Sequence, residues 1–251
     1  MSKLPMPTPP WATDGKQIVF VSTGDENGAN EIWRVAVSDT KPGKVVGELK
    51  GGYHTTPRWS PDGKWLVFGF EVGSQREIHA VSLLTNKRFE FLSGRHNYVS
   101  PVISQDMKSL YFLSDAGGVA DIWKVGISFS SEKLEIISDP QALTVGIGMR
   151  RFSLTADTRI LVYSMGGVAT SVGYKYKGGG VGATLLMQID PDQVFGFSTA
   201  KRFDFDGQSD PEFSPDGKWI AFESERSGKN EIWRTTIDGN ELVQVTDDER
   251  T

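Results

Sequence analysis

The stretch WSPDGKWLVF at residues 59–68 recurs almost unchanged as FSPDGKWIAF at residues 213–222. The Asp of this turn marks five related units that follow one another along the chain, each about 50 residues long. The turn residues are Asp14, Asp62, Asp106, Asp157 and Asp216. A basic residue stands two positions after each of them, and an aromatic residue stands six positions after each. The chain is therefore built from repeats.

Each unit is predicted to contain four short strands. The first strand leads into the Pro-Asp-Gly turn, where Pro presets the backbone and Gly accepts the left-handed conformation. In the last unit the second strand is KWIAFES at 218–224, the third is EIWRTTI at 231–237 and the fourth is ELVQVT at 241–246. No segment shows sustained helical periodicity. Four-stranded units of this length predict an all-β fold, a β-propeller of antiparallel blades.

We expect a single propeller domain over residues 1–251. The predicted blades cover residues 5–50, 51–94, 95–145, 146–205 and 206–251. Because an open ring would expose strand edges, these five blades form either a closed five-bladed ring or part of a ring of six or seven blades.

Composition excludes several classes of function. The net charge of −5 and the lack of a basic run argue against nucleic acid as the partner. Cys is absent, which excludes disulfides, thiolate metal sites and Cys nucleophiles. No apolar run reaches membrane-spanning length, so we expect no membrane insertion. The first residues, MSKLPMPTPPWATDGK, lack the apolar segment of an intact signal peptide.

These motifs resemble the TolB-type propeller repeat, a WD-repeat-like blade in which Pro-x-Trp-Ser-Pro-Asp-Gly-Lys is followed by a Glu-Ile-Trp strand. Residues 57–68, 77–79, 211–222 and 231–233 match this pattern closely, and the resemblance extends over essentially the whole chain. It implies a propeller fold. Relatives of this kind include the periplasmic protein TolB, propeller domains of prolyl-oligopeptidase-like serine peptidases, oligogalacturonate lyases and sensor regions of membrane-bound transcription regulators.

Units three and four depart from the repeat at the turn. Met107 and Thr158 replace the turn Gly, and because a β-branched residue is costly at positive φ, we expect the fourth turn to have a different geometry. Unit four is also the longest. Its third strand is either SVGYKYK at 171–177 or TLLMQID at 184–190; the second choice is favoured and makes residues 166–183 an enlarged loop.

Residues of the third strand are interpreted as structural. Trp33, Trp123 and Trp233 are expected to fill the space between blades rather than to stack on sugars. His79 takes the place of this Trp in unit two and is read as a filler of the same kind. Acidic residues recur at one register of this strand, and we expect them to pair with neighbouring strands or with the basic residue after the turn. They are Glu31, Glu77, Asp121 and Glu231.

A search for catalytic groups finds none that is complete. KGGGVGAT at 177–184 has Ala183 where a phosphate-binding loop requires Lys. VYSMGG has Val162 where the nucleophile elbow of a serine hydrolase requires Gly. The remaining two His, His54 and His96, are too few for a metal site without a third ligand. We therefore predict no catalytic residues, no cofactor and no metal.

The loops that precede the first strands differ between units, and we name them the approach loops: residues 51–56, 94–100, 146–151 and 206–210. In a propeller the innermost strands line the central channel, so these loops are expected to meet around one mouth. Aromatic, Arg and His side chains at such a mouth suit recognition of a peptide or an anionic group. The predicted partner-binding residues are Tyr53, His54, Arg95, His96, Asn97, Tyr98, Arg150, Arg151 and Asp210.

The leading hypothesis is a non-enzymatic propeller that binds a protein or peptide partner through one face. Two alternatives stay open, the propeller of a larger prolyl-oligopeptidase-like serine peptidase and a polysaccharide-degrading lyase. The resemblance favours the periplasm, while the absence of a signal peptide favours the cytoplasm. The sequence gives no indication of the oligomeric state.

Overall fold

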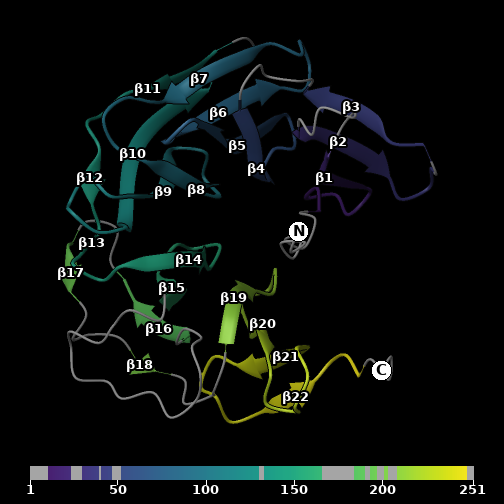
Figure 1. Ribbon diagram of the computed structural model, residues 1–251, viewed down its shortest axis with the longest axis vertical. Helices are drawn as coiled ribbons and strands as arrows, with labels where there is room; N and C mark the ends of the chain where they lie inside the picture. Colours follow the sequence, from purple (N-terminus) through teal and green to yellow (C-terminus); the bar gives the residue numbers. More distant parts are fainter. Residues whose placement is uncertain are drawn as a thin grey trace. The chain divides into compact units, whose positions relative to one another are not determined.

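A computed structural model describes residues 11–23, 30–39, 41–46, 52–129, 133–165, 184–189, 193–196, 201–202 and 208–247. Every regular element within these ranges is a β-strand, which confirms the all-β prediction. The chain divides into two compact units, each of which contains several of the repeats and which we call unit 1 and unit 2. Unit 1 comprises Met1–Ala116 and Trp123–Gln141, and unit 2 comprises Gly117–Ile122 and Ala142–Thr251. Figure 1 labels the strands along the chain. Within the described ranges, no helix is long and apolar enough to cross a membrane.

The first three sheets follow the chain in simple up-and-down order. The first contains β1 (Gln17–Thr23), β2 (Asn30–Ala36) and β3 (Gly43–Val46). The second contains β4 (Gly52–Trp59), β5 (Trp65–Val72), β6 (Gln75–Ser82) and β7 (Arg88–Leu92). The third contains β8 (Tyr98–Ile103), β9 (Ser109–Ser114), β10 (Asp121–Phe129) and β11 (Leu134–Ile136), and β12 (Gln141–Ala142) also pairs with β10.

Two further four-stranded sheets lie in unit 2. One contains β14 (Met149–Leu154), β15 (Ile160–Met165), β16 (Thr184–Gln188) and β18 (Lys201–Arg202). The other contains β19 (Gln208–Phe213), β20 (Trp219–Ser224), β21 (Glu231–Thr236) and β22 (Leu242–Gln244). A short parallel pair, β13 (Thr144–Val145) with β17 (Phe195–Gly196), was not predicted. The meander order of the larger sheets is that of propeller blades.

The third strand of the fourth repeat is β16, which pairs antiparallel with β15. The choice of TLLMQID as this strand is therefore confirmed over its first five residues. The rejected segment, SVGYKYK, and the proposed enlarged loop at 166–183 lie outside the described residues.

The fourth turn has the same geometry as the others, so the prediction of a different one was wrong. Thr158 has φ 58°, close to the 69° of Gly217 at the same position of the last repeat. In both turns a hydroxyl donates to the turn Asp at 2.6 Å, from Thr155 in one and from Ser214 in the other. The Asp carboxylate also accepts the backbone N–H two residues on. These bonds fix the turn strongly enough to hold a β-branched residue in the left-handed region.

A β-bulge interrupts the first strands β4, β8 and β19 where the repeat places Pro. In β19, Asp210 and Pro211 together oppose Phe222 of β20. Proline has no N–H to give to the ladder, which is why it is tolerated at a bulge. In β14 the corresponding residue is Phe152, which pairs regularly with Tyr163, and Arg150 becomes the extra residue instead. Loss of the Pro thus moves the bulge towards the start of the strand.

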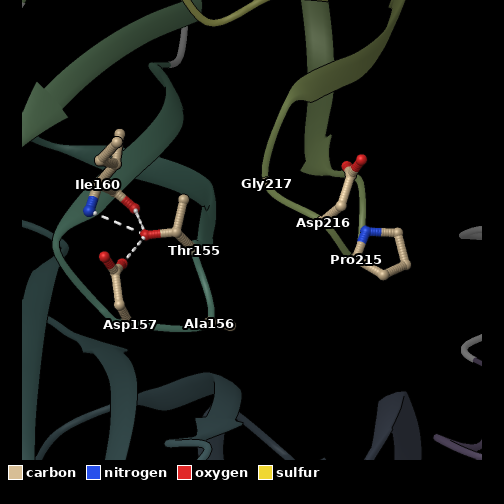
Figure 2. A pocket seen from close by; sticks show the side chains of 7 residues that line it. All are labelled: Thr155, Ala156, Asp157, Ile160, Pro215, Asp216 and Gly217. Carbon is tan, nitrogen blue, oxygen red and sulfur yellow. Dashed lines mark hydrogen bonds between the residues drawn. The ribbon is translucent and has the colours of Figure 1, made fainter.

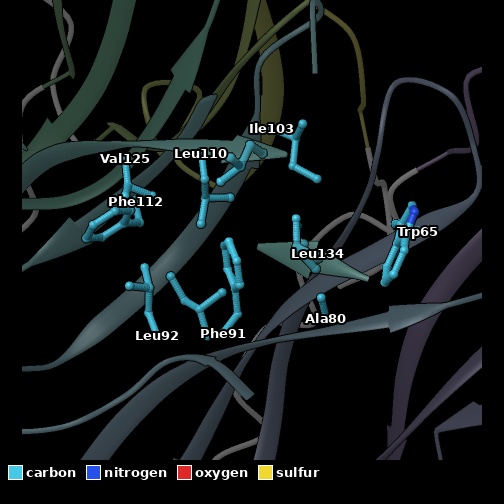
Figure 3. Close-up of a cluster of buried hydrophobic side chains, with 12 residues drawn as sticks. Trp65, Ala80, Phe91, Leu92, Ile103, Leu110, Phe112, Val125 and Leu134 are labelled. Carbon is cyan, nitrogen blue, oxygen red and sulfur yellow. The ribbon is translucent and has the colours of Figure 1, made fainter. Parts of the chain in front are cut away.

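The largest described core cluster lies in unit 1, between the second and third sheets (Figure 3). Trp65 and Phe91 of one sheet pack with Ile103, Leu110 and other apolar side chains of the next. Trp123 packs against this cluster, and Trp233 packs against a second one in unit 2. These two Trp side chains therefore act as packing residues, as predicted. Neighbouring sheets of the same unit thus pack apolar faces against each other.

Candidate functional site

Of the predicted approach loop 94–100, residues 98–100 lie in β8, and residues 94–97 are held by hydrogen bonds in unit 1. Asp115 accepts two bonds from Asn97, one from its backbone N–H at 2.9 Å and one from its side-chain amide at 2.6 Å. The amide oxygen of Asn97 accepts the N–H of Arg76 at 3.2 Å. Burial alone would raise the pKa of Asp115, but the bonds from Asn97 outweigh it, so the pKa lies below its ordinary value. Asp115 is therefore ionised, and its hydrogen bonds hold the backbone and side chain of Asn97 in place.

The predicted residues of this loop have different surroundings. His96 lies with its Nδ1 3.8 Å from Oδ1 of Asp115, and both side chains are about two-fifths exposed. Arg95 is exposed. Tyr98 turns inward: its ring meets Phe112 edge-on at 5.8 Å between centroids and packs against the core cluster. Tyr53 and His54 lie in β4, and their side chains are outside the described part of the structure.

Asp121 holds the loop at 146–151 in unit 2. It is 2% exposed and accepts bonds from the Thr144 hydroxyl at 3.1 Å, the Gly146 N–H at 2.7 Å and the Ile147 N–H at 3.0 Å. The residues that follow are Met149, which is buried, and Arg150, which is exposed. A buried carboxylate thus fixes the backbone just before an exposed guanidinium.

Arg151 and Asp210 form an ion pair within unit 2. The Nε of Arg151, in β14, lies 2.5 Å from Oδ1 of Asp210, in β19, and the two side chains are 39% and 34% exposed. Beside this pair, the Phe213 N–H donates to the Ser153 hydroxyl at 3.2 Å. Of the nine predicted residues, the structure brings Arg151 and Asp210 together in this unit, and His96 and Asn97 around Asp115 in the other. That all nine form one mouth stays a prediction.

The acidic residues of the third strand are structural. Lys44 of β3 pairs with Glu31 of β2, and the Thr246 hydroxyl donates to Glu231. By contrast, Lys64 and Lys218, which follow two of the turns, lie near their own turn Asp, with Nζ 3.9 Å from Asp62 and 3.8 Å from Asp216. The predicted pairing with a neighbouring strand is therefore observed for Glu31, whereas Glu77 contacts His79 of its own strand.

Sequence reasoning missed a polar network around His79. This side chain is 1% exposed. Its Nε2 lies 2.8 Å from Oε2 of Glu77, and its Nδ1 accepts the Nε–H of Arg88 at 2.9 Å. Burial lowers the pKa of His79, against the opposing effect of the Glu77 hydrogen bond. The ring also stacks on Phe68 at 6.0 Å between centroids. The signal was present in the sequence as a His in place of a repeated Trp.

The pattern of the TolB beta propeller domain family matches residues 1–165. The chain belongs to this family. A curated relative of this TolB-family propeller is an uncharacterized protein of Agrobacterium fabrum, 24% identical over 202 residues. The match covers 76% of this chain and 57% of the relative. The chain thus spans little more than half the length of that protein.

Solved structures agree with this family at the level of the fold. TolB from Acinetobacter baumannii superimposes with a TM-score of 0.69 at 20% identity, over 96% of this chain and 54% of that one. A puromycin-hydrolyzing peptidase of Mycobacterium tuberculosis gives 0.61 at 14% identity, over 92% of this chain and 35% of the peptidase. At these identities the likeness concerns the propeller fold alone, which binding proteins and enzymes share.

The TolB-family turns leave a hollow of about 290 Å³ in unit 2, between the Asp157 turn and the Asp216 turn (Figure 2). Figure 2 shows that the Asp157 carboxylate is turned towards the Thr155 hydroxyl of its own turn. Hydrogen bonds from hydroxyls lower the pKa of Asp157 and of Asp216. The polar atoms that line this hollow therefore already serve the scaffold. Across the described ranges, no three His, Asp or Glu side chains gather as a metal site.

Proposed function

We propose that the chain is a non-enzymatic TolB-like binding module that recognises a protein or peptide through its approach loops. The observation that carries this proposal is the construction of the loops at 94–97 and 146–151. In each, carboxylate hydrogen bonds fix the backbone while an arginine, Arg95 or Arg150, stays exposed. A fixed loop loses little conformational entropy on binding, which suits a recognition surface.

A peptide library selection tests this proposal. The protein is immobilised and selected against a phage library of random dodecapeptides, and the enriched peptides are measured against variants. We expect the combined substitution His96→Ala, Arg150→Ala and Arg151→Ala to weaken their binding about tenfold, because interface Arg residues often dominate affinity. Failure of the library to yield any saturable binder would contradict a peptide-binding role.

A charge-matched variant provides the control. Lys64, Lys108 and Arg159 are exposed basic residues that follow the turns. Replacing all three with Ala removes at least as much positive charge but leaves the approach loops intact. We expect this variant to bind the selected peptides like the wild type. Both variants should unfold cooperatively in circular dichroism, and the loss of the Arg151–Asp210 pair should lower the stability of the first by no more than about 1 kcal/mol.

A second candidate is supported by the fold similarity to the puromycin-hydrolyzing peptidase, in which a comparable propeller is part of a larger protein. On that hypothesis the chain is the propeller of a serine peptidase and its loops admit peptide substrates. Sequencing the gene on both sides of this chain distinguishes the two. An adjoining domain with a Gly-x-Ser-x-Gly elbow would decide for the peptidase.

We also propose that the protein acts in the bacterial periplasm, as the likeness to TolB suggests. Fractionation of the native host checks this location. Recovery of the protein with cytoplasmic markers would contradict it.

A further inference from the structure

Arg150 stands out among the basic residues of unit 2. It has no partner among the described residues, whereas its neighbour Arg151 is held by Asp210. Arg150 is also the extra residue of the bulge, since Met149 pairs with Met165 and Arg151 pairs with Ser164. A bulge re-aims a side chain relative to the regular alternation of the strand. Here it leaves Arg150 exposed beside the buried Met149.

Hydrogen bonds to the buried Asp121 fix the backbone that leads to Arg150. Oδ1 of Asp121 accepts the Ile147 N–H and Oδ2 accepts the Gly146 N–H, at 3.0 and 2.7 Å. The Met149 N–H in turn donates to the Ala120 carbonyl at 2.7 Å. Both carboxylate oxygens of Asp121 accept backbone hydrogen bonds, and among the described contacts Asp121 forms no ion pair with Arg150. A backbone held in this way lowers the conformational entropy that is lost when a ligand binds to Arg150.

The same construction recurs independently in unit 1. Asp115 accepts both bonds from Asn97, and Gln75 donates to the Gly94 carbonyl at 3.2 Å. Between these two fixed points stands Arg95, which is exposed and has no partner within the described ranges. Two approach loops of different sequence therefore share one arrangement: a carboxylate fastens the backbone and an unpaired guanidinium is presented.

We infer that each of these two loops binds a carboxylate group of a peptide, with Arg150 as the receptor in one and Arg95 in the other. This inference rests on the proposed binding function and names the chemistry that the partner must carry. A guanidinium takes a carboxylate through two parallel N–H···O bonds, which gives orientation as well as attraction. Since the chain carries a net charge of −5, the recognition is local rather than due to a general positive field.

Arg159 supplies a matched internal comparison. It is an exposed arginine of the same unit, placed after β14 whereas Arg150 lies within its start. The backbone N–H of Arg159 itself donates to the Asp157 carboxylate at 3.1 Å, whereas Asp115 accepts the N–H of Asn97, two residues after Arg95. At Arg159 a free peptide carboxylate must compete with the charge of Asp157. Binding at Arg159 should therefore be weaker than at Arg150 or Arg95.

The test is a titration of the ¹⁵N-labelled protein, observed through the side-chain Nε–H signals of the arginines. The probe is acetyl-Gly-Glu-Gly-Glu-Gly-amide, and its matched control replaces both Glu with Gln. We expect the Nε–H signals of Arg95 and Arg150 to shift and saturate with the Glu peptide only, and the signal of Arg159 to move far less. A third arm, the Gln peptide with a free C-terminal carboxylate, distinguishes chain ends from side chains as the source of the carboxylate.

Substitutions then assign the effect. In Arg150→Ala, the amide signals of Gly146 and Ile147 should no longer respond to the Glu peptide, while the response of Arg95 persists. Arg150→Lys keeps the charge but loses the paired geometry, so the affinity read from those amides should fall roughly threefold. Arg159→Ala should leave every response unchanged.

Three outcomes would overturn the inference: no shift at Arg95 and Arg150, an equal shift at Arg159, or the same shifts with sodium acetate at equal carboxylate concentration, which means nonspecific ion pairing only. If the Gln peptide instead perturbs the loop amides without the arginines, peptide binding stands and the carboxylate assignment falls. Failure of the proposed function itself is read separately, from the library selection.

Discussion

Arg151 and Asp210 occupy the same position of two successive repeats, six residues before the turn Asp, and they pair with each other at 2.5 Å. Asp210 holds this position with φ 51°, in the left-handed region that an L-residue adopts at a cost. The backbone bulge and the ion pair therefore stabilise one arrangement together: the bulge aims the carboxylate, and the guanidinium of the neighbouring blade receives it.

A double-mutant cycle measures this relationship. We expect Arg151→Ala and Asp210→Ala to show a coupling of about 0.5–1 kcal/mol in the free energy of unfolding, because the pair is only half-buried. High salt should reduce the coupling. Urea unfolding of the four proteins at low and high salt provides the measurement.

The pair Lys218 and Asp216 is the control for this cycle. Its charged atoms lie 3.8 Å apart on more exposed side chains of the same unit. Its coupling should be close to zero. Equal coupling in the two pairs would mean that the contact between Arg151 and Asp210 contributes nothing specific.

The turn residue Thr158 predicts a stabilising substitution. Thr158→Gly removes the strain of a β-branched residue at φ 58°. Gly makes the unfolded chain more flexible, so we expect a net gain of only about 0.5–1 kcal/mol. The reciprocal change, Gly217→Thr, should cost about 1–2 kcal/mol at the equivalent turn. Chemical denaturation measures both, and a loss on Thr158→Gly would show that the Thr side chain contributes more than its backbone costs.

Much of this fold follows from the sequence because the repeated turn is a local structure. Asp216 bonds to Ser214 and to the Lys218 N–H, all within four residues, so the motif alone specifies the hairpin. The strands on either side then follow from their aromatic and aliphatic residues. The third strand of the fourth repeat could likewise be identified from the apolar residues of TLLMQID.

The wrong prediction at Thr158 has a local cause, because the rule about β-branched residues ignores the hydrogen bonds that Thr155 forms with Asp157 and Ile160. Other features depend on partners distant in sequence and could not be predicted. The surroundings of His79 depend on the strand register that places Arg88 of β7 beside it. The pairing of Arg151 with Asp210 requires two blades to be adjacent. For His79 and Arg151 the residue was visible in the sequence, but the neighbour that it contacts was not.

Tyr163 offers a second stabilising change. It is fully buried where other repeats have Phe, and its hydroxyl has no hydrogen-bond partner among the described residues. Burial raises the pKa of this phenol, as expected for a group that water does not reach. Removing an unsatisfied buried hydroxyl relieves its desolvation cost. We expect Tyr163→Phe to raise the free energy of unfolding by about 1 kcal/mol.

Phe112 supplies the opposite experiment, since it is the equivalent residue of the third repeat and is 1% exposed. Phe112→Tyr should lower stability by about 1–3 kcal/mol, because it buries a new hydroxyl in the core. Thermal and urea unfolding of both variants check the pair. A loss on Tyr163→Phe would reveal that the hydroxyl has a favourable role in the native state.

The network around His79 predicts that stability depends on pH. Burial lowers the pKa of His79 in the folded protein, while in the unfolded chain its pKa is close to about 6.5. Below that pH the unfolded state binds a proton that the folded state resists. The free energy of unfolding should therefore fall as the pH drops below about 6.5, by up to about 1.4 kcal/mol per pH unit, until the folded-state pKa is reached.

Burial is the main reason why His79 resists a proton, and Arg88 adds to it. The Nδ1 of His79 accepts a hydrogen bond from Arg88, so protonation would set two cations against each other. Glu77 and Glu90 favour the protonated form, but they do not outweigh burial and Arg88 together. Between pH 5 and 8 the carboxylates of Asp106, Asp157 and Asp216 stay ionised, because hydrogen bonds hold their pKa below the ordinary value. The titration of these three carboxylates therefore does not overlap with that of His79 in this pH range.

The variant His79→Gln isolates this contribution, because His54 and His96 are present in both proteins. Urea unfolding at half-unit steps from pH 5 to 8 should give a wild-type curve that falls towards acid more steeply than that of the variant. The difference between the two curves should be flat above about pH 7 and should shrink below about 6.5, where the native network loses its advantage. Parallel curves, or a wild type that gains stability on acidification, would show that His79 is not held neutral by its burial.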